Sequence, residues 1–286
     1  REQFGCDIRT IDEIAASDDV DAVAICTPTD THADLIEQFV RAGKAVFCEK
    51  PVDLNANRVR ECLATVEAEN GHLMLGFQRR FDPDFMALKA AIDAGQIGEV
   101  EMIVITSRDP GAPPYDYIER SGGIFRDMTV HDLDVARWLL GEEVISVQAS
   151  ASVLTDPKIG EHGDYDSANL ILKTASGKLC AITNSRRAAY GYDQRIEVHG
   201  SKGSVSAGNQ HEANIEIATA RGYQRPPLLD FFMTRYTRAY ANEIEAFVNA
   251  VENNTEMPIT GTDGLRALEL ADAALASVQT GQAVKP

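Results

Sequence analysis

The chain of 286 residues has the composition of an ordinary globular protein, with 44% hydrophobic and 25% charged residues. This length is sufficient for two domains, or for one large α/β domain, with a substantial buried core. Its 44 acidic and 27 basic residues give a net charge of −17, and such a surface repels phosphate backbones and anionic lipids. We therefore expect neither nucleic acid nor a membrane as a partner. A phosphate-containing cofactor remains compatible with this charge, because a local loop of backbone N–H groups can bind it.

The cysteines are an odd, scattered set without a C-x-x-C spacing: Cys6, Cys26, Cys48, Cys62 and Cys180. Three of them lie inside apolar segments, where a free cysteine behaves as a small buried hydrophobic residue. This pattern favours a reducing compartment, and we expect a cytoplasmic protein. No apolar run approaches the length of a membrane span, and the residues before Val20 are too polar for a signal peptide.

Short apolar strands alternate with amphipathic helices in the first third of the chain. Apolar and β-branched runs predict strands over residues 20–26, 45–48 and 73–77. Helices are expected to begin near Thr10, which heads a capping box, near Thr31, and after Asn55. This alternation is typical of a doubly wound parallel sheet, so the predicted fold class is α/β. We expect this first domain to cover residues 1–76.

The pattern changes after Phe77. Helices are predicted over residues 84–94 and 125–140, with a strand over 100–106 and a proline-containing loop between them. Strand-like runs joined by turns follow at 144–153, 166–173, 178–184, 194–199 and 214–219, and two amphipathic helices follow at 236–252 and 263–279. The sequence therefore predicts a second, α+β domain over residues 77–286 with a largely antiparallel open sheet.

Two of the predicted parallel strands end in residues that suit ligand binding. Thr27-Pro28 follows the first strand, and Glu49-Lys50-Pro51 follows the second. Ligands of open parallel sheets lie beyond the carboxyl ends of the strands, and a proline directly after Lys50 restricts the backbone that carries it. The alternative is that Lys50 is a surface residue in a turn, with Glu49 as an ion-pair partner.

The strongest chemical signal lies in the predicted helix over residues 125–140. Asp127 and His131 are four residues apart and are expected to share one face. A histidine beside a carboxylate can act as a general base near neutral pH, although it can also be a partly buried residue satisfied by that carboxylate. A metal site of His131, Asp132 and Asp134 is less favoured, since adjacent residues point to different faces and no second histidine cluster accompanies them.

Other polar residues are weaker candidates for ligand binding. His32 lies near the end of the first strand and could border a cofactor, with capping or packing as the alternative. Arg79 and Arg80 suit a hydroxylated ligand, but an arginine pair is equally suited to ion pairs. The segment 184–193, which contains Tyr192, offers many hydrogen-bond donors, or is an ordinary polar hairpin.

Taken together, these segments resemble the Gfo/Idh/MocA family of NAD(P)-dependent oxidoreductases. The motifs that carry the resemblance occur in family order along essentially the whole chain: Ala24-Ile25-Cys26-Thr27-Pro28 with His32; Ala42-Gly43-Lys44 leading to Glu49-Lys50-Pro51; Gly76-Phe77-Gln78-Arg79-Arg80-Phe81-Asp82-Pro83; and Gly122-Gly123-Ile124-Phe125-Arg126-Asp127 with His131-Asp132. Each motif is weak alone, but their order and spacing are specific. Within the family, the stretches 107–110 and 186–194 most resemble inositol 2-dehydrogenases.

The resemblance implies a Rossmann domain followed by an α/β domain whose open sheet forms a tetramer interface, and hence a homotetramer. It implies that the family's catalytic residues are Lys50, Asp127 and His131. It also implies NAD as the cofactor, with NADP as the alternative, beside Thr27, Pro28, His32, Glu49 and Lys50. Candidates for binding a polyol or sugar substrate are Arg79, Asp109 and Tyr192.

The chain departs from the family pattern in one respect: it contains neither a G-x-G-x-x-G fingerprint nor the acidic residue about 20 positions further on. The family places both before the position of Arg1, so we expect the Rossmann domain to lack its N-terminal part here.

The expected reaction is oxidation of a secondary alcohol of a cyclic polyol such as myo-inositol. His131 would accept the hydroxyl proton, Lys50 would stabilise the oxygen, and Asp127 would accept a hydrogen bond from a substrate hydroxyl. The alternatives are an aldose or modified sugar as substrate, a non-catalytic cofactor-binding protein, and a glycoside hydrolase that uses bound NAD.

Overall fold

The computed structural model describes residues 5–286, which form two compact units. The first unit contains the described residues up to Phe77 together with Glu243–Leu265. The second contains Gln78–Asn242 and Arg266–Pro286. No helix among the described residues is long and apolar enough to cross a membrane.

The first unit is built on a parallel sheet with strand order β1-β2-β3. Its elements are α1 (Ile11–Ala15), β1 (Ala22–Ile25), η1 (Thr29–Thr31), α2 (His32–Arg41), β2 (Ala45–Glu49), α3 (Ala56–Ala68) and β3 (Leu73–Gly76). Thr10 and Glu13 form the predicted capping box, and the Asn55 side chain caps α3. The central strand β2 is almost wholly buried, as expected of a parallel strand covered on both faces. The predicted parallel α/β fold is therefore confirmed.

Glu243–Leu265 packs with the first unit, whereas the single predicted boundary assigned it to the second domain. The rings of Phe47 and Phe247 lie 5.9 Å apart, and the Leu75 N–H donates to the Ile259 carbonyl at 3.4 Å. These contacts join segments about 180 residues apart in the chain, which local periodicity does not detect.

The second unit is built on a sheet of six strands in the order β5-β6-β7-β4-β8-β9. These strands are β4 (Val100–Arg108), β5 (Val144–Ser152), β6 (Ser167–Thr174), β7 (Leu179–Ser185), β8 (Asp193–Gly200) and β9 (Gly203–Ala207). The β4–β7 pair is parallel and the other four pairs are antiparallel, so the sheet is largely antiparallel, as predicted. A separate hairpin consists of β10 (Ile217–Thr219) and β11 (Gly222–Gln224).

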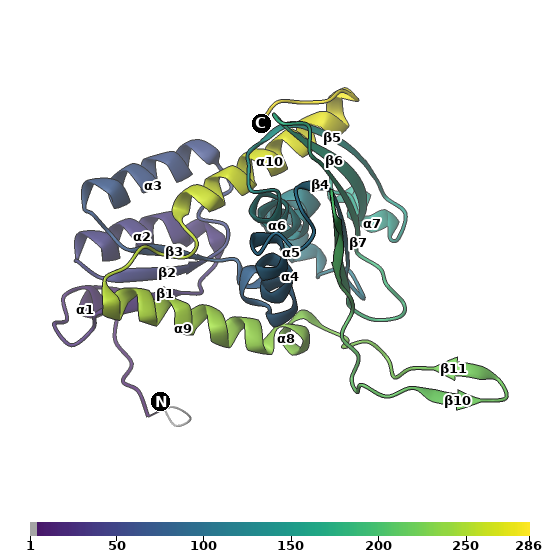
Figure 1. Ribbon diagram of the computed structural model, residues 1–286. Coiled ribbons are helices and arrows are strands. Elements are labelled where there is room, and N and C mark those ends of the chain that lie inside the picture. The colour runs from purple at the N-terminus through teal and green to yellow at the C-terminus, as the bar shows by residue number, and fades with distance from the viewer. Residues whose placement is uncertain (1–4) are drawn as a thin grey trace. The chain divides into compact units, whose positions relative to one another are not determined.

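Helices cover one face of this sheet (Figure 1). The helical elements of the second unit are η2 (Gln78–Phe81), α4 (Pro83–Asp93), α5 (Tyr115–Ser121), η3 (Phe125–Thr129), α6 (Val130–Leu140), α7 (Pro157–Glu161) and α8 (Phe232–Arg235). Two helices pass from one unit to the other, α9 (Thr237–Asn253) and α10 (Gly261–Thr280). Apolar residues of α4, α6 and the end of α10 pack with the inward residues of the strands to form the core.

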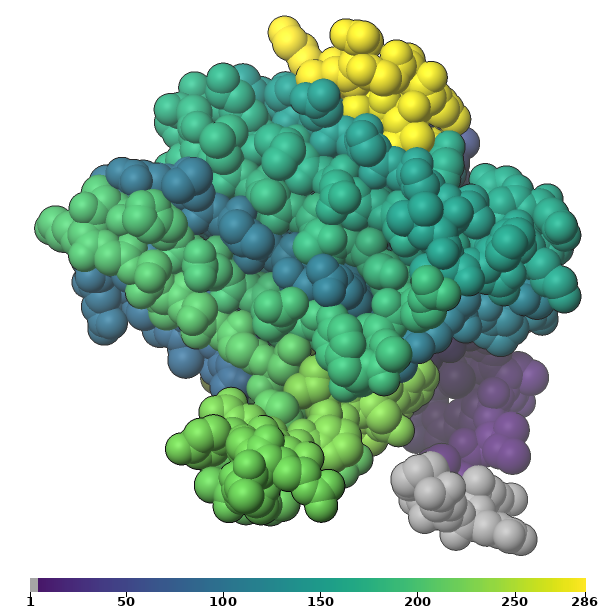
Figure 2. Space-filling model, turned by 90° about the vertical axis from the view of Figure 1, so that its right-hand side faces the viewer, coloured from purple at the N-terminus to yellow at the C-terminus, as the bar shows by residue number. Residues whose placement is uncertain are grey.

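The long helices of residues 5–286 leave the other face of the sheet uncovered, and Figure 2 is viewed onto that face, with the strands in teal and green. Alternating burial along β6 and β7 shows that one residue in two points to this side. Met102, Val104, Ile171 and Leu179 on this face are between 39% and 49% exposed. The sheet is thus open on this face and has an apolar centre. The open sheet is the feature that the sequence predicts.

Several elements differ from the sequence prediction, among them η3, α5 and β9. The helix expected over 125–140 begins with a π-helical turn, η3, before α6. The proline-containing loop continues into α5, which was missed because the helix buries few residues, among them Ile118. The edge strand β9 was also missed, because its sequence GSVSA is mostly small and polar.

Candidate active site

The carboxyl ends of β1 and β2 lie at one edge of the first unit, because the strands are parallel. Thr27 and Pro28 are exposed just after β1, and the Thr27 hydroxyl lies 2.6 Å from that of Thr31. His32 is buried, and its ring nitrogens lie 2.8 Å from the carbonyl oxygens of Pro51 and Thr27. His32 therefore ties the two strand-end loops together, which is a structural role.

Lys50 and Glu49 stand at the end of β2, before a cis peptide bond to Pro51. Burial raises the pKa of the Glu49 carboxyl, while the charges of Lys50 and His32 oppose that effect. The Glu49 carboxylate also passes close over Gly76, where an added Cβ would lie 3.0 Å from its Oε2. Lys50 is half-buried and is thus held at the edge of the sheet.

This edge fits a dinucleotide such as NAD. Dinucleotides bind beyond the carboxyl ends of parallel strands. Here the exposed Thr27 and Pro28 and the cationic Lys50 follow the ends of two adjacent strands. Thr27, Pro28 and Lys50 are the residues of this chain that would contact the cofactor, and His32 and Glu49 would hold the loops that carry them.

The second unit positions Asp127 on η3, after two glycines with left-handed backbone conformations. Gly122 and Gly123 have φ values of 81° and 82°. Asp164 accepts a hydrogen bond from the Ile124 N–H at 2.8 Å, and its carboxylate occupies the space beside Gly123. An added Cβ on Gly123 would lie 2.7 Å from Asp164 Oδ1. The glycine pair thus allows Asp164 to hold the start of the helix. A π-helical turn is rare, and such turns often occur at functional sites.

We expect Gly123→Ala to destabilise the protein by about 1–3 kcal/mol, because it adds both backbone strain and a clash with Asp164. Urea unfolding followed by circular dichroism measures this loss. Gly111→Ala is the matched control, since an added Cβ there meets nothing within 4 Å. Equal stability of the two variants would contradict the conclusion that Gly123 is required for Asp164 to hold the start of the helix.

The Asp127 carboxylate receives contacts from two different elements. The Tyr117 hydroxyl of α5 donates to Oδ1 at 2.9 Å, and both terminal nitrogens of Arg186 lie 3.5 Å from Oδ2. Arg186 also contacts Asp164 at 3.4 Å. The local sequence pattern indicates Arg186 only as one donor in the segment 184–193, and it gives no signal for Tyr117 or Asp164.

His131 lies in the first turn of α6 and is half-buried. The two aspartates beside it, Asp132 and Asp134, are fully buried and form ion pairs with Arg79 and Arg80. The carboxylates that a metal site at His131 would require therefore form ion pairs with Arg79 and Arg80 instead. His131 differs from them in reaching partly to the surface.

Arg79 is the centre of a buried polar network. Besides Asp132 it contacts the Ser107 hydroxyl at 3.3 Å, and Asp132 accepts from the Asn184 amide at 2.7 Å. Ser107 in turn donates to Gln194 at 3.0 Å. The network joins η2, α6, β4, β7 and β8 and had no local sequence signal, because its members are distant in the chain.

The three predicted substrate-binding residues are brought together. The Arg79 charge acts on both Asp109 and Tyr192, and the rings of Tyr192 and Tyr236 lie 6.0 Å apart. Burial raises the pKa of Asp109 to about 6, although Arg79 and Arg186 oppose the shift. Burial likewise raises the pKa of Tyr192 well above its usual value, so its phenol stays protonated at neutral pH.

Asp109→Asn should stabilise the protein at about pH 8 by on the order of 1–2 kcal/mol, with a smaller gain at about pH 5. The Asp109 pKa of about 6 exceeds its unfolded value, so the native state loses stability as the pH rises through 6. The asparagine cannot ionise and avoids this loss. Urea unfolding at both pH values tests the prediction, with the exposed Asp116→Asn as control. A difference independent of pH would contradict it.

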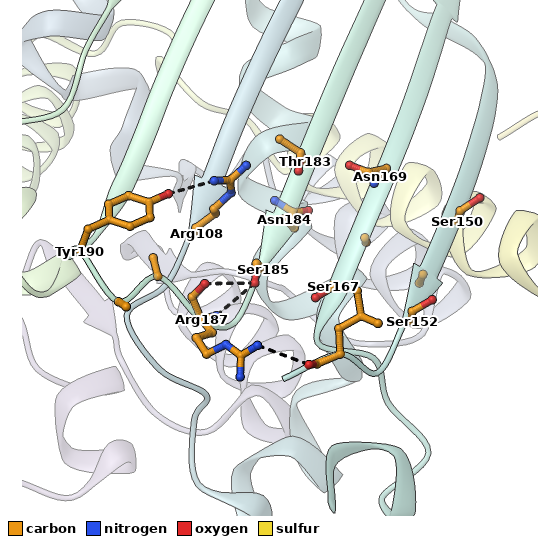
Figure 3. A pocket seen from close by; sticks show the side chains of 15 residues that line it. Arg108, Ser150, Ser152, Ser167, Asn169, Thr183, Asn184, Ser185, Arg187 and Tyr190 are labelled. Carbon is orange, nitrogen blue, oxygen red and sulfur yellow. Dashed lines mark hydrogen bonds between the residues drawn. The ribbon is translucent and has the colours of Figure 1, made fainter. Parts of the chain in front are cut away.

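A hollow of about 480 Å³ lies on the open face, across the ends of β4, β7, β6 and β5 (Figure 3). Arg108 donates to the Tyr190 hydroxyl at its rim, and Arg187 donates to the Leu154 carbonyl. Its lining otherwise consists mainly of serine, threonine, asparagine and alanine side chains.

Two family models match the chain in succession. Residues 1–77 match the oxidoreductase family model with the NAD-binding Rossmann fold, and residues 85–206 match the GFO/IDH/MocA C-terminal domain. An inositol 2-dehydrogenase from Rhizobium meliloti (strain 1021) is 68% identical over 275 residues, which are 96% of this chain and 83% of that protein. A myo-inositol 2-dehydrogenase from Thermotoga maritima is 45% identical over 273 residues, 96% of this chain and 82% of that protein.

The chain belongs to the Gfo/Idh/MocA family of oxidoreductases.

Solved structures of Gfo/Idh/MocA proteins share this fold. A myo-inositol dehydrogenase from Corynebacterium glutamicum ATCC 13032 superposes with a TM-score of 0.93 at 42% identity, covering 97% of this chain and 84% of that chain. The scyllo-inositol dehydrogenase from Lactobacillus casei, solved with NAD(H) and scyllo-inositol, superposes with a TM-score of 0.89 at 30% identity, covering 97% and 83%. The family and the fold predicted from sequence are thereby confirmed.

Proposed function

We propose that this protein is an NAD-dependent dehydrogenase that oxidises a secondary alcohol of an inositol, with myo-inositol as its substrate. The observation that carries the proposal is the 68% identity to an inositol 2-dehydrogenase over nearly the whole chain. The half-buried His131 and the polar cluster of Arg79, Asp109 and Tyr192 add chemical support. A polyol with a hydroxyl on every carbon requires many polar contacts, which such a cluster provides.

His131 is the group that accepts the hydroxyl proton. A general base must reach the substrate oxygen directly, and His131 is less buried than the neighbouring Asp132. For Lys50, the family resemblance implies a hydrogen bond to the substrate oxygen, which stabilises the negative charge that develops in the reaction. Asp127 accepts a hydrogen bond from a substrate hydroxyl and favours the basic role of His131. The cofactor NAD would supply the acceptor for the hydride that leaves the carbinol carbon.

Arg79, Asp109 and Tyr192 select the substrate through polar contacts. Tyr192 keeps its proton and can donate to a ring hydroxyl, while Asp109 can accept from one. Arg79 is engaged with Asp132 and Ser107, so it contributes positive charge beside these two groups. A substrate that lacks a hydroxyl at this point leaves buried polar groups without partners, which costs affinity.

The test is NADH formation by the full-length protein, followed by absorbance, with myo-inositol, scyllo-inositol, glucose and xylose compared in parallel. Turnover with an inositol in clear preference to the aldoses is expected. Turnover with an aldose alone would retain the Lys50, Asp127 and His131 chemistry and overturn the substrate. NAD binding without any turnover would favour a non-catalytic protein, and glycoside cleavage without net NADH would indicate a hydrolase. Parallel assays with NADP test the cofactor preference.

The open face of the second unit supports a homo-oligomer, and a tetramer is the expected state. Exposed apolar residues in adjacent strands, such as Met102 opposite Leu179, form a continuous centre on this face. Large exposed apolar patches of this kind mark protein interfaces. Light scattering of the wild type and of Val104→Glu tests this, and the variant should form smaller species. A monomeric wild type would overturn it.

A reducing compartment, the cytoplasm, is the proposed location. Support comes from the cysteines, because all five are free, and Cys48, Cys62 and Cys180 are buried among apolar residues. Fractionation of the cells that produce the protein tests the assignment.

A further inference from the structure

The Asp127 carboxylate is held by groups from two separate segments, α5 and the residue that follows β7. Oδ1 accepts from the Tyr117 hydroxyl of α5 at 2.9 Å. Oδ2 faces the guanidinium of Arg186, which follows β7, at 3.5 Å from both terminal nitrogens. Hydrogen bonds from either side fix the rotation of a carboxylate as well as its position.

Arg186 has the burial expected of a structural cation. Its side chain is only 1% exposed, and its terminal nitrogens reach Asp164 as well as Asp127. Its backbone N–H donates to the Asp166 carbonyl at 2.8 Å, which anchors the main chain at the same point. Its charge opposes the burial that raises the pKa of the Asp164 carboxyl.

Asp164 extends this arrangement to the backbone of the helix. One of its oxygens accepts from the Ile124 N–H, and the other contacts Arg186. The chain of contacts therefore runs from the helix start through Asp164 and Arg186 to Asp127. The same carboxylate that holds the helix also orients the cation that faces Asp127.

Tyr117 reaches Asp127 from a more exposed position. Its ring is 44% exposed, and α5 lies between a proline-containing loop and the Gly122-Gly123 pair. Burial and the Asp127 charge raise the pKa of Tyr117, so the phenol remains a donor throughout the neutral range.

We propose that Arg186 and Tyr117 are positioning residues that hold the Asp127 carboxylate in the orientation that the substrate requires. Arg186 acts from the interior and Tyr117 from α5. The inference rests on the proposed function, since it assigns Asp127 a part in the reaction. Neither residue is proposed to touch the reacting carbon.

Tyr117→Phe removes one hydroxyl and tests the α5 side of this arrangement. We expect kcat/KM for myo-inositol to fall roughly tenfold, because a hydrogen bond to a charged group is lost. Tyr115→Phe is the matched control: it lies on the same helix, and its hydroxyl donates to Asp156 instead. NAD affinity and the unfolding midpoint should change little in either variant.

A double-mutant cycle with Asp127→Asn shows whether Tyr117 acts through Asp127. The tenfold effect of Tyr117→Phe should shrink to less than about twofold when Asp127 is already asparagine. An unchanged tenfold effect would overturn the positioning role of Tyr117. No loss of activity on Asp127→Asn itself would instead refute the proposed function of Asp127, so the two failures are distinguishable.

Arg186→Gln and Arg186→Lys test the interior side through kcat/KM for myo-inositol. Loss of the guanidinium contacts to Asp127 should lower kcat/KM roughly tenfold in Arg186→Gln. Arg186→Lys keeps a cationic donor at this position and should restore part of the loss.

The exposed neighbour Arg187 provides the matched control, and Arg187→Gln should leave kcat/KM close to that of the wild type. Should Arg186→Gln not fold, the Tyr117 cycle still decides the question. An unchanged kcat/KM in a folded Arg186→Gln variant, or additive Tyr117 and Asp127 effects, would overturn the inference.

Discussion

Replacing His131 by alanine is expected to lower kcat by roughly 10²- to 10⁴-fold, the range that general acid–base catalysis contributes. Hydride cannot leave the carbinol carbon efficiently unless the hydroxyl proton is removed in the same process. No other histidine lies on α6, and the neighbouring Asp132 and Asp134 form buried ion pairs with arginines. Steady-state NADH formation with saturating myo-inositol measures the loss.

The cofactor affinity of His131→Ala should remain close to that of the wild type, because His131 belongs to the second unit and the strand-end residues that fit NAD belong to the first. Fluorescence titration with NADH tests this. His162→Ala is the control, since that exposed histidine pairs with Glu119 near α7. An unchanged kcat in His131→Ala would exclude the proton-acceptor role.

Replacing Asp132 by alanine is expected to destabilise the protein by about 3–5 kcal/mol, the loss typical when one partner of a buried ion pair is removed. Asp132 is fully buried, and its removal leaves the buried guanidinium of Arg79 without its counter-charge. The Asn184 amide loses an acceptor at the same time. Urea unfolding of the wild type and the variant measures the difference.

Two further variants distinguish the loss of stability caused by removing the Asp132 charge from the loss caused by truncating any aspartate side chain. Asp132→Asn preserves the shape and should cost less than alanine, whereas Asp116→Ala on exposed α5 should change stability by less than about 0.5 kcal/mol. A loss below about 1 kcal/mol in Asp132→Ala would show that the network is not a stability element.

Much of the fold could be predicted from local patterns. The capping box at Thr10, the Asn55 cap and the buried strand β2 all depend on short-range periodicity and turn chemistry, and each forms as predicted. The alternating burial of β6 and β7 likewise follows from a period of two. The strand-end positions of Thr27 and Lys50 follow from those same elements.

The partners of the candidate site residues could not be predicted in this way. Tyr117 lies in a short helix with few buried residues, and Arg186 has a neighbouring arginine of the same type that is exposed. Arg186 differs from Arg187 in being buried. Which of the two is buried depends on which side of the chain packs against the core. The sequence is compatible with either ligand binding or ion pairing for Arg79, and only its contact with Asp132 identifies it as an ion-pair donor.

The sequence by itself determined most of the strands and helices along the chain, the open α+β sheet, and the family motifs that contain Lys50, Asp127 and His131, because these depend on residues close in the chain. Only the tertiary structure decided that Glu243–Leu265 returns to the first unit and that Asp127 faces Tyr117 and Arg186. It also decided that Asp132 and Asp134 are buried with arginines. The ion pairs of these three aspartates with arginines join residues more than 50 positions apart. Such contacts arise from packing, and hydrophobic periodicity contains no information on which distant side chains will meet.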